Sequence, residues 1–321
     1  MNATSSNDDT ITTSAPGKVI LTGEHFVVHG SHAVAAAINK RARATVSPTK
    51  ELESEIVSDG VTSPVLRDDG LFQVIKSVVA SIFKEYGKPK SKFRIQIDSE
   101  IPQGSGLGSS AAIAVATSAA LTSFMGEKMS NDQIRDLASV GEKSVHGNPS
   151  GIDTQASLQG GVFLFNRENG PKPIRIDRAL QLLVVFSGRT RKTAELISKV
   201  NEVRNKNPGS FQHLLRAASF LSVEVSDALT RCDLPRLGSL IDLSQLSLSC
   251  IGVSTNELDT LIESLRMADA LGAKITGAGG GGSVIALPKQ EEADLLLRRI
   301  SSDYPHSFLT PLPQEGLRWE M

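Results

Sequence analysis

The chain has 321 residues, with 34 lysines and arginines against 35 aspartates and glutamates, which gives a formal net charge of −1. A charge this close to zero argues against a general nucleic-acid or anionic-membrane binder, and 4% aromatic residues argue against a base-stacking surface. Hydrophobic residues at 40% indicate a folded globular protein, and the length favours two domains.

The N-terminal residues and the cysteines fit a cytoplasmic protein. Residues 1–9 are polar and lack an apolar run, so no signal peptide is expected. Cys232 and Cys250 are too few and too far apart for a disulfide framework or a zinc site. The uncharged stretch 101–126 is rich in glycine, serine and threonine, which argues against a membrane span. We therefore expect a soluble protein that contacts neither a membrane nor nucleic acid.

The first half of the chain mixes strand-like and helix-like apolar spacing. The capping-box pattern Ser130–Gln133 marks one helix start. In chain order we expect two short strands around a turn at Pro16-Gly17, strands over 33–46 and 93–99, helices over 71–86, 111–124 and 131–145, and a hairpin over 156–165 turning at Gly160-Gly161.

The second half begins with the buried strand 182–186 and continues mainly with amphipathic helices. These are expected over 192–204, 211–230, 233–248, 255–271 and 290–301, with a strand over 282–287. Strands and helices do not alternate regularly, which favours an α+β fold over a doubly wound sheet. We expect an N-terminal domain over residues 10–180 and a C-terminal domain over residues 181–321.

The glycine-rich segment Pro102–Ser110 is the strongest local signal for chemistry. It lies between a predicted strand and a predicted helix, and its glycines alternate at Gly104, Gly106 and Gly108. Backbone N–H groups in such a loop, together with the helix start, can bind phosphate. The spacing matches neither a Walker A loop nor the dinucleotide fingerprint. A tight turn that packs helix against strand is the alternative.

A second glycine run, Gly277–Gly282, contains four consecutive glycines, which are costly to order. A flexible linker is one reading. Its flanks, Lys274–Thr276 and Ser283–Leu287, are strand-like, which favours a loop that passes close to a ligand or to the first glycine loop.

Two carboxylates flank the helix stop at Gly147–Gly151. Glu142 lies late on a helix, and Asp153 follows a turn. Phosphoryl transfer uses one carboxylate for magnesium and often another to accept the hydroxyl proton. A solvated glutamate and a turn-capping aspartate are the plain alternatives.

Lys18 follows the Pro16-Gly17 pair, and an exposed surface charge is the commoner case for a lysine after such a turn. His25, His29 and His32 cluster in the sequence, but Gly30 interrupts the helical spacing that a metal site would need. We therefore expect no metal bound through these histidines.

Four segments resemble motifs of the GHMP kinase superfamily and, within it, of the mevalonate kinases. They are Ala15–Gly30, residues 102–112, His146–Asp153 and Lys274–Gly282, in the order typical of that superfamily. The resemblance implies an N-terminal domain like the second domain of ribosomal protein S5, a ferredoxin-like C-terminal domain, and an active site between them. It also implies ATP-dependent phosphorylation of the 5-hydroxyl of mevalonate.

The resemblance implies a role for each matching residue. Asp153 would accept the hydroxyl proton, and Lys18 would lie between that oxygen and the γ-phosphate. Ser110 and Glu142 would hold Mg²⁺. The expected substrate contacts are Glu24, His25, Arg191 and Thr193. The expected ATP contacts are Ser99, Gly104, Ser105, Gly106, Leu107, Gly108, Ser109 and Ser110. The resemblance is the only reason to expect a homodimer. The C-terminal helices can equally bury their apolar faces within one chain.

The residues after Gly23-Glu24-His25 separate this chain from related kinases. Phe26-Val27-Val28 follows here, whereas galactokinases carry Thr-Asp-Tyr. Phosphomevalonate kinases usually carry tyrosine at the His25 position. A kinase acting on phosphomevalonate or on a sugar is the alternative enzyme, and a non-catalytic sensor is the alternative class. The segment Gln245–Leu248 lacks the histidines of the animal enzymes.

Overall fold

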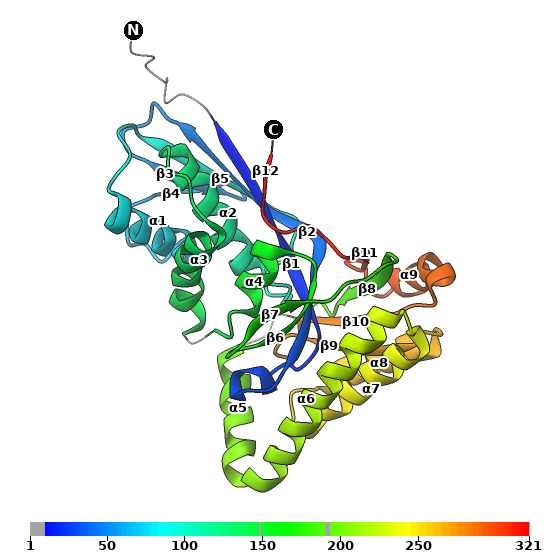
Figure 1. Cartoon of the computed structure of the whole chain (residues 1–321). Helices are drawn as coiled ribbons and strands as arrows, with labels where there is room; N and C mark the ends of the chain where they lie inside the picture. The colour runs from blue at the N-terminus through cyan, green and yellow to red at the C-terminus, as the bar shows by residue number, and fades with distance from the viewer. Residues whose placement is uncertain (1–9, 148, 190–192, 321) are drawn as a thin grey trace.

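The computed structural model describes residues 10–147, 149–189 and 193–320 (Figure 1). Within these residues, one mixed sheet of eight strands has the order β12-β1-β2-β5-β3-β4, with β6 and β7 attached beside β2. Its strands are β1 (Ile11–Thr22), β2 (Ala33–Pro48), β3 (Glu55–Ser58), β4 (Val61–Pro64), β5 (Phe93–Ser99), β6 (Val162–Asn166), β7 (Gly170–Pro173) and β12 (Arg318–Glu320).

Four helices pack on this sheet and on one another (Figure 1). They are α1 (Gln73–Tyr86), α2 (Ser109–Phe124), α3 (Asn131–His146) and α4 (Ile152–Gln159). The predicted capping box at Ser130 opens α3. The small side chains of α2, mostly alanine and serine, are buried on nearly all sides and let it approach both β1 and β2 closely.

A second sheet of four antiparallel strands has the order β11-β8-β10-β9 within the described part of the chain. The strands are β8 (Leu180–Phe186), β9 (Gly272–Thr276), β10 (Ser283–Leu287) and β11 (Phe308–Leu312). The helices beside it are α5 (Thr193–Lys206), α6 (Pro208–Arg231), α7 (Leu234–Cys250), α8 (Asn256–Met267) and α9 (Ala293–Ser301). Two short 3-10 helices, η1 (Phe26–His29) and η2 (Gln290–Glu292), complete the elements.

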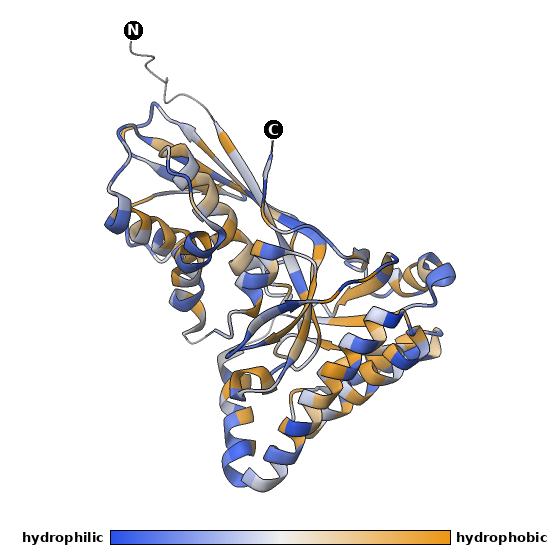
Figure 2. Ribbon diagram, in the orientation of Figure 1, coloured by the Kyte–Doolittle hydropathy of each residue, from blue (hydrophilic) through white to orange (hydrophobic). Residues whose placement is uncertain are grey.

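The fold is α+β, as the irregular order of elements predicted. Figure 2 shows apolar residues concentrated on the strands and on the sides of helices turned toward them, with polar residues around the α5–α6 connection. The boundary at residue 180 stays a prediction. The final strand β12 pairs with β1, so the end of the chain returns to the first sheet.

Two predicted elements are wrong. Residues 11–22 form one strand, not two, because the register shift between Pro16 and Lys18 is a bulge that takes up the missing N–H of proline without ending the strand. The hairpin over 156–165 is the end of α4 followed by β6. Gly160 and Gly161, both at positive φ, end the helix instead of turning a hairpin.

The linker reading of Gly277–Gly282 is also wrong. The run connects the paired strands β9 and β10 and packs tightly. A Cβ at Gly279 would lie 2.4 Å from the carbonyl oxygen of Val253, and one at Gly280 would lie 2.8 Å from Leu196. The glycines are therefore required by close packing.

Candidate active site

Lys18 and Asp153 form the centre of the site. Lys18 follows the bulge in β1, and its side chain is only 2% exposed. Its Nζ lies 3.2 Å from Asp153 Oδ1 and donates to the carbonyl oxygen of Gly106 at 3.1 Å. Asp153 lies in the first turn of α4, where the helix dipole favours a carboxylate. A buried ammonium thus faces a partly exposed carboxylate.

The glycine loop lies directly against Lys18. The backbone N–H of Lys18 donates to Leu107 O at 2.8 Å. Gly104, Gly106 and Gly108 all have positive φ, and a Cβ at Gly108 would lie 3.0 Å from Lys18 Cγ. Glycine is therefore needed at position 108, where the loop backbone comes close to the Lys18 side chain. The loop and the Lys18–Asp153 pair form one structural unit.

The serines of this region differ in what they contact. The Ser105 hydroxyl donates to Pro102 O at 2.6 Å, and Ser99 Oγ accepts from the Ile101 N–H at 3.2 Å, so both shape the loop. Ser109 and Ser110 open α2, whose first turn presents backbone N–H groups beside the loop. This arrangement suits an anion such as a polyphosphate.

Glu142 lies on α3 and is almost completely buried. The Thr154 hydroxyl donates a hydrogen bond to its carboxylate. Burial, and then the neighbouring charge of Asp153, raise the pKa of Glu142 to about 7. A cation bound beside this carboxyl group would favour its ionised form.

Glu24 and His25 follow directly on β1. Glu24 forms a buried ion pair with Lys274 of β9, and its Oε2 has no hydrogen-bond partner among the described residues. Burial raises the pKa of Glu24 and lowers the pKa of Lys274. His25 has a φ of 60°, and its Nε2 lies 2.9 Å from Ala278 O of the second glycine run. This run therefore reaches the site.

A pocket of about 500 Å³ joins these residues. It brings together Lys18, Glu24, His25, Glu142 and Asp153, all of which the sequence predicted. The glycine-loop residues 104–110 are not among its lining residues. Further lining residues are Ile20, Val27, Val28, His29, Pro149, Ser150, Gly151, Arg167, Ile197, Val200, Asn201, Gly277 and Ala278.

Two further titratable residues, Arg167 and His29, line the pocket. Neither of them was predicted from the sequence as a site residue. Arg167 follows β6, and its Nη2 donates to Pro149 O at 2.8 Å, in the segment before Asp153. It stands in no recognisable motif. Burial lowers the pKa of His29, and the positive charges of Arg204 and Arg167 act in the same direction. Arg191 lies outside the described residues, and Thr193 begins α5.

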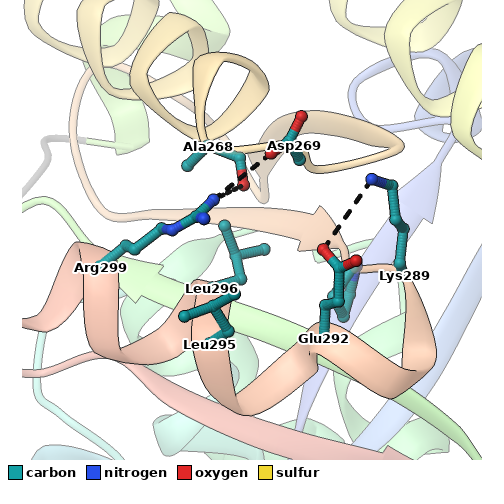
Figure 3. Close-up of a pocket in the computed structure, with 8 residues that line it drawn as sticks. Ala268, Asp269, Lys289, Glu292, Leu295, Leu296 and Arg299 are labelled. Carbon is teal, nitrogen blue, oxygen red and sulfur yellow. Dashed lines mark hydrogen bonds and ion pairs between the residues drawn. The ribbon is translucent and has the colours of Figure 1, made fainter.

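A second hollow, between α9 and the end of α8, contains no space for a ligand (Figure 3). Its charged residues already pair with one another. Arg299 lies 3.4 Å from Asp269, and Lys289 lies 3.8 Å from Glu292. The hollow is therefore a surface feature and not a candidate site.

The residues at the larger pocket fit a magnesium ion. Among the described residues, no group of three or more His, Cys, Asp or Glu side chains forms a protein-only metal cage. Mg²⁺ in kinases does not require one, because one or two carboxylates act together with substrate phosphates and water. Glu142 lines the pocket and provides such a carboxylate. Its side chain is buried, and its pKa is raised.

Comparison with protein families gives three matches. The family described as GHMP kinases N terminal domain matches residues 73–161, and GHMP kinases C terminal matches residues 225–306, together more than half of the chain. The galactokinase galactose-binding signature matches residues 3–48, which include β1 and β2.

Individual relatives agree over the full length. The chain is 38% identical to a mevalonate kinase of Archaeoglobus fulgidus, covering 96% of this chain and 99% of that protein. It is 35% identical to the mevalonate kinase of Aeropyrum pernix, covering 96% and 97%. The crystal structure of L. major mevalonate kinase in complex with R-mevalonate superposes with a TM-score of 0.84 at 27% identity, covering 98% of this chain and 100% of that one.

The chain therefore belongs to the GHMP kinases, a class of ATP-dependent phosphotransferases. Lower-identity structures such as L. lactis galactokinase, at 20% identity and a TM-score of 0.79, share this fold. Within the class, full-length relatives at 35–38% identity make the chain a member of the mevalonate kinase family.

Proposed function

We propose that this chain transfers the γ-phosphoryl group of ATP to the 5-hydroxyl of mevalonate, giving 5-phosphomevalonate and ADP. The observation that carries the proposal is the Lys18–Asp153 pair on the wall of the 500 Å³ pocket. Membership of the mevalonate kinase family supports the choice of substrate.

Asp153 acts as the base. A primary alcohol has a pKa far above 7, so its oxygen attacks the γ-phosphorus while it loses its proton to a carboxylate placed beside it. The bond from the γ-phosphorus to the bridging oxygen breaks, and ADP leaves with that electron pair. Lys18, 3.2 Å from Asp153, holds the carboxylate in place and stabilises negative charge on the transferring group.

The glycine loop and the start of α2 hold the triphosphate. Backbone N–H groups from Gly104 to Ser110 suit the phosphate oxygens, and Ser99 lies just upstream on β5. Glu142 and the Ser110 hydroxyl would hold Mg²⁺, which neutralises charge on the β- and γ-phosphates when bound.

The remaining pocket residues suit the rest of mevalonate. His25 and Glu24 Oε2, which has no partner in the part of the chain that the structure describes, provide hydrogen-bonding groups for its hydroxyls. Arg167 supplies a positive charge for its carboxylate. Arg191 and Thr193 are kept in this proposal as the further substrate contacts that the resemblance to the mevalonate kinases implies.

Two broader expectations accompany the proposal. No helix in the described part of the chain is long and apolar enough to cross a membrane, and we keep a cytoplasmic location as a prediction. A homodimer also stays a prediction. Its interface would cover exposed apolar side chains of α6 and α7, namely Phe220, Val223, Leu243 and Leu246.

A sugar kinase is the alternative that one observation favours, because the galactose-binding signature matches residues 3–48. The match includes Gly23-Glu24-His25, yet Phe26 and Val27 are buried apolar residues where a galactokinase carries polar ones. Phosphomevalonate would need a further basic cluster, for which Arg189, Arg191 and Lys192 are candidates.

The test is ADP release by purified protein with Mg-ATP and, separately, mevalonate, 5-phosphomevalonate and galactose. We expect turnover with mevalonate and the new phosphate on its 5-oxygen. Turnover with phosphomevalonate or galactose alone would replace the proposed substrate. ATP binding without transfer to any alcohol would favour a sensor.

A further inference from the structure

The end of the chain contacts the helix that carries Asp153. Residues 314–320, here called the C-terminal strap, run from β11 back to the first sheet (Figure 1). Gly161 N–H donates to Gln314 O at 2.7 Å, and Leu317 N–H donates to Leu158 O at 3.0 Å. The strap therefore binds the C-terminal end of α4, whose N-terminal turn contains Asp153.

The contact is backbone against backbone. A Cβ at Gly316 would lie 2.2 Å from Leu158 O, and a Cβ at Gly160 would lie 2.2 Å from the nitrogen of Gly316. Glycine at both positions is what allows this approach, since real Cβ atoms do not come so close to backbone. Any side chain at Gly316 must move either the strap or α4.

Arg41 on β2 fastens the strap to β1. Its guanidinium donates to Glu315 O at 3.1 Å and to Gly316 O at 2.6 Å. The same group donates to Ser14 Oγ at 2.7 Å and Ser14 O at 2.9 Å. The strap and β1 are thus joined by the fixed fork of donors of one partly buried arginine, a geometry that lysine does not reproduce.

The strap also pairs along β1, with Ser14 opposite Arg318 and Thr12 opposite Glu320. Trp319 Nε1–H donates to Ser123 Oγ of α2 at 3.1 Å. The strap therefore touches β1, α2 and α4. These elements carry Lys18, the end of the glycine loop and Asp153, respectively.

Helix α4 is only eight residues long, so a shift at its end is felt at its start. Two further side chains of α4 anchor it: the Ser157 hydroxyl donates to Pro16 O at 2.8 Å, beside the bulge that precedes Lys18, and the Thr154 hydroxyl donates to Glu142 of α3. We propose that the C-terminal strap, clamped by Arg41, is a positioning element that holds Asp153 against Lys18. This inference rests on the proposed role of Asp153 as the base.

The test compares Gly316→Val with the control Glu315→Gln. Glu315 is exposed and contacts Arg41 through its carbonyl oxygen, so the control keeps the backbone of the strap. We expect Gly316→Val to lower kcat at least tenfold while KM for ATP changes less than twofold, and Glu315→Gln to stay within twofold of the unaltered chain. Ile82→Ala, at a fully buried residue of α1, serves as a control for lost stability alone.

Arg41→Met is the second variant, in case Gly316→Val does not fold. Hydrogen exchange of the peptide covering α4 gives a readout that needs no activity, and we expect it to quicken in both strap variants and not in Glu315→Gln or Ile82→Ala. Unchanged kcat and unchanged α4 exchange in a folded strap variant would overturn the inference. Loss of turnover in Ile82→Ala equal to that in Gly316→Val would also overturn it.

Failure of the proposed function is a separate result. It would show as absence of turnover with mevalonate in the unaltered chain. The exchange comparison then still decides whether the strap orders α4, and the kcat comparison is made with whichever alcohol the chain accepts.

Discussion

Lys274 donates to Glu24 in a setting where neither side chain reaches solvent, with 0% and 2% exposed. The ammonium also donates to the carbonyl oxygens of Ile20 and Ile275. These contacts fix one carboxylate oxygen of Glu24 and leave Oε2 without a partner among the described residues. The pair joins β1 to β9, and so the first sheet to the second, at the wall of the pocket.

Replacing Lys274 by methionine leaves Glu24 buried without its counter-charge. We expect a loss of about 3–5 kcal/mol in the free energy of unfolding, because breaking a buried pair leaves an uncompensated charge. We also expect KM for mevalonate to rise more than KM for ATP, since Glu24 lines the pocket. Denaturant unfolding and steady-state kinetics measure the two effects.

Lys289→Met is the matched control, because Lys289 is a partly exposed lysine paired at 3.8 Å with Glu292. Its effect on unfolding should stay within about 1 kcal/mol. Equal stability of the Lys274 and Lys289 variants would show that the buried pair is not important for the fold.

Asp153→Asn preserves shape but removes the base. We expect kcat to fall by about 10²–10⁴-fold, the range that general-base catalysis contributes. Binding of a non-hydrolysable ATP analogue should persist, as measured by calorimetry. Asp177→Asn, at an exposed aspartate beside Arg175, is the control. Near-normal kcat in Asp153→Asn would assign the proton transfer to another group.

Glu142→Gln tests the magnesium assignment. The amide keeps the size of the side chain but loses the negative oxygen that Mg²⁺ prefers. We expect half-maximal activity to need at least tenfold more Mg²⁺, measured by titration at fixed ATP. Glu263→Gln, on the exposed side of α8, should leave the titration unchanged. An unchanged curve for Glu142→Gln would move the metal site elsewhere.

Gly108→Ala tests the contact between the glycine loop and Lys18. Both Gly108 and Gly126 have positive φ, 79° and 83°, so alanine strains the backbone at each by about 1–2 kcal/mol. Only at Gly108 does the new Cβ meet a neighbour, Lys18 Cγ at 3.0 Å. We expect Gly108→Ala to lower kcat/KM for ATP at least tenfold and Gly126→Ala to lower stability alone. Equal kinetics in the two variants would count against the role of the loop.

Asp69, just before α1, takes part in a polar cluster that contributes to stability in a pH-dependent way. Lys76 and then Ser63 donate hydrogen bonds to Asp69, at 2.5 and 2.6 Å, and hold the pKa of its carboxyl well below the ordinary value of 3.8. The folded chain therefore binds this proton less tightly than the unfolded chain. The stabilisation is present above the ordinary pKa and is lost as the pH falls below it.

We expect Asp69→Asn to be less stable than the unaltered chain near neutral pH, with a difference that shrinks as the pH is lowered from about 5 toward about 2. Denaturant unfolding at a series of pH values measures this. The neighbouring exposed Asp68→Asn should show no such convergence. A difference for Asp69→Asn that is independent of pH would contradict the assignment.

Local patterns predicted much of the fold. The alternation of Phe93–Ser99 and the capping box at Ser130 concern neighbours within a few residues, and both elements formed as expected. The short strand Arg318–Glu320 went unpredicted because its pairing partner β1 lies far away in the sequence. The hairpin of Glu55–Ser58 and Val61–Pro64 went unpredicted for another reason, since strands of four residues are too short to show a clear alternation. Gly160-Gly161 misled the prediction because a glycine pair ends a helix as readily as it turns a hairpin.

In the candidate site, too, local motifs predicted some residues, while others depend on contacts between distant parts of the chain. Lys18 and Asp153 stood in recognisable motifs, Glu142 was predicted from its place on the helix before the second of them, and the structure brings all three to one pocket. Arg167 stands in no motif and reaches the pocket only because β6 pairs with β2. Lys274 stood in a strand-like flank and in the motif segment Lys274–Gly282, but it was given no role of its own, because its buried partner Glu24 is 250 residues away in the sequence.

The C-terminal strap contains the single tryptophan of the chain, Trp319. Its indole is about half exposed (51%) and is held by Ser123 of α2. Indole emission shifts to longer wavelength when the ring becomes more hydrated. The intrinsic fluorescence of the unlabelled enzyme therefore reports, during turnover and in every variant, whether the end of the chain is attached to the sheet.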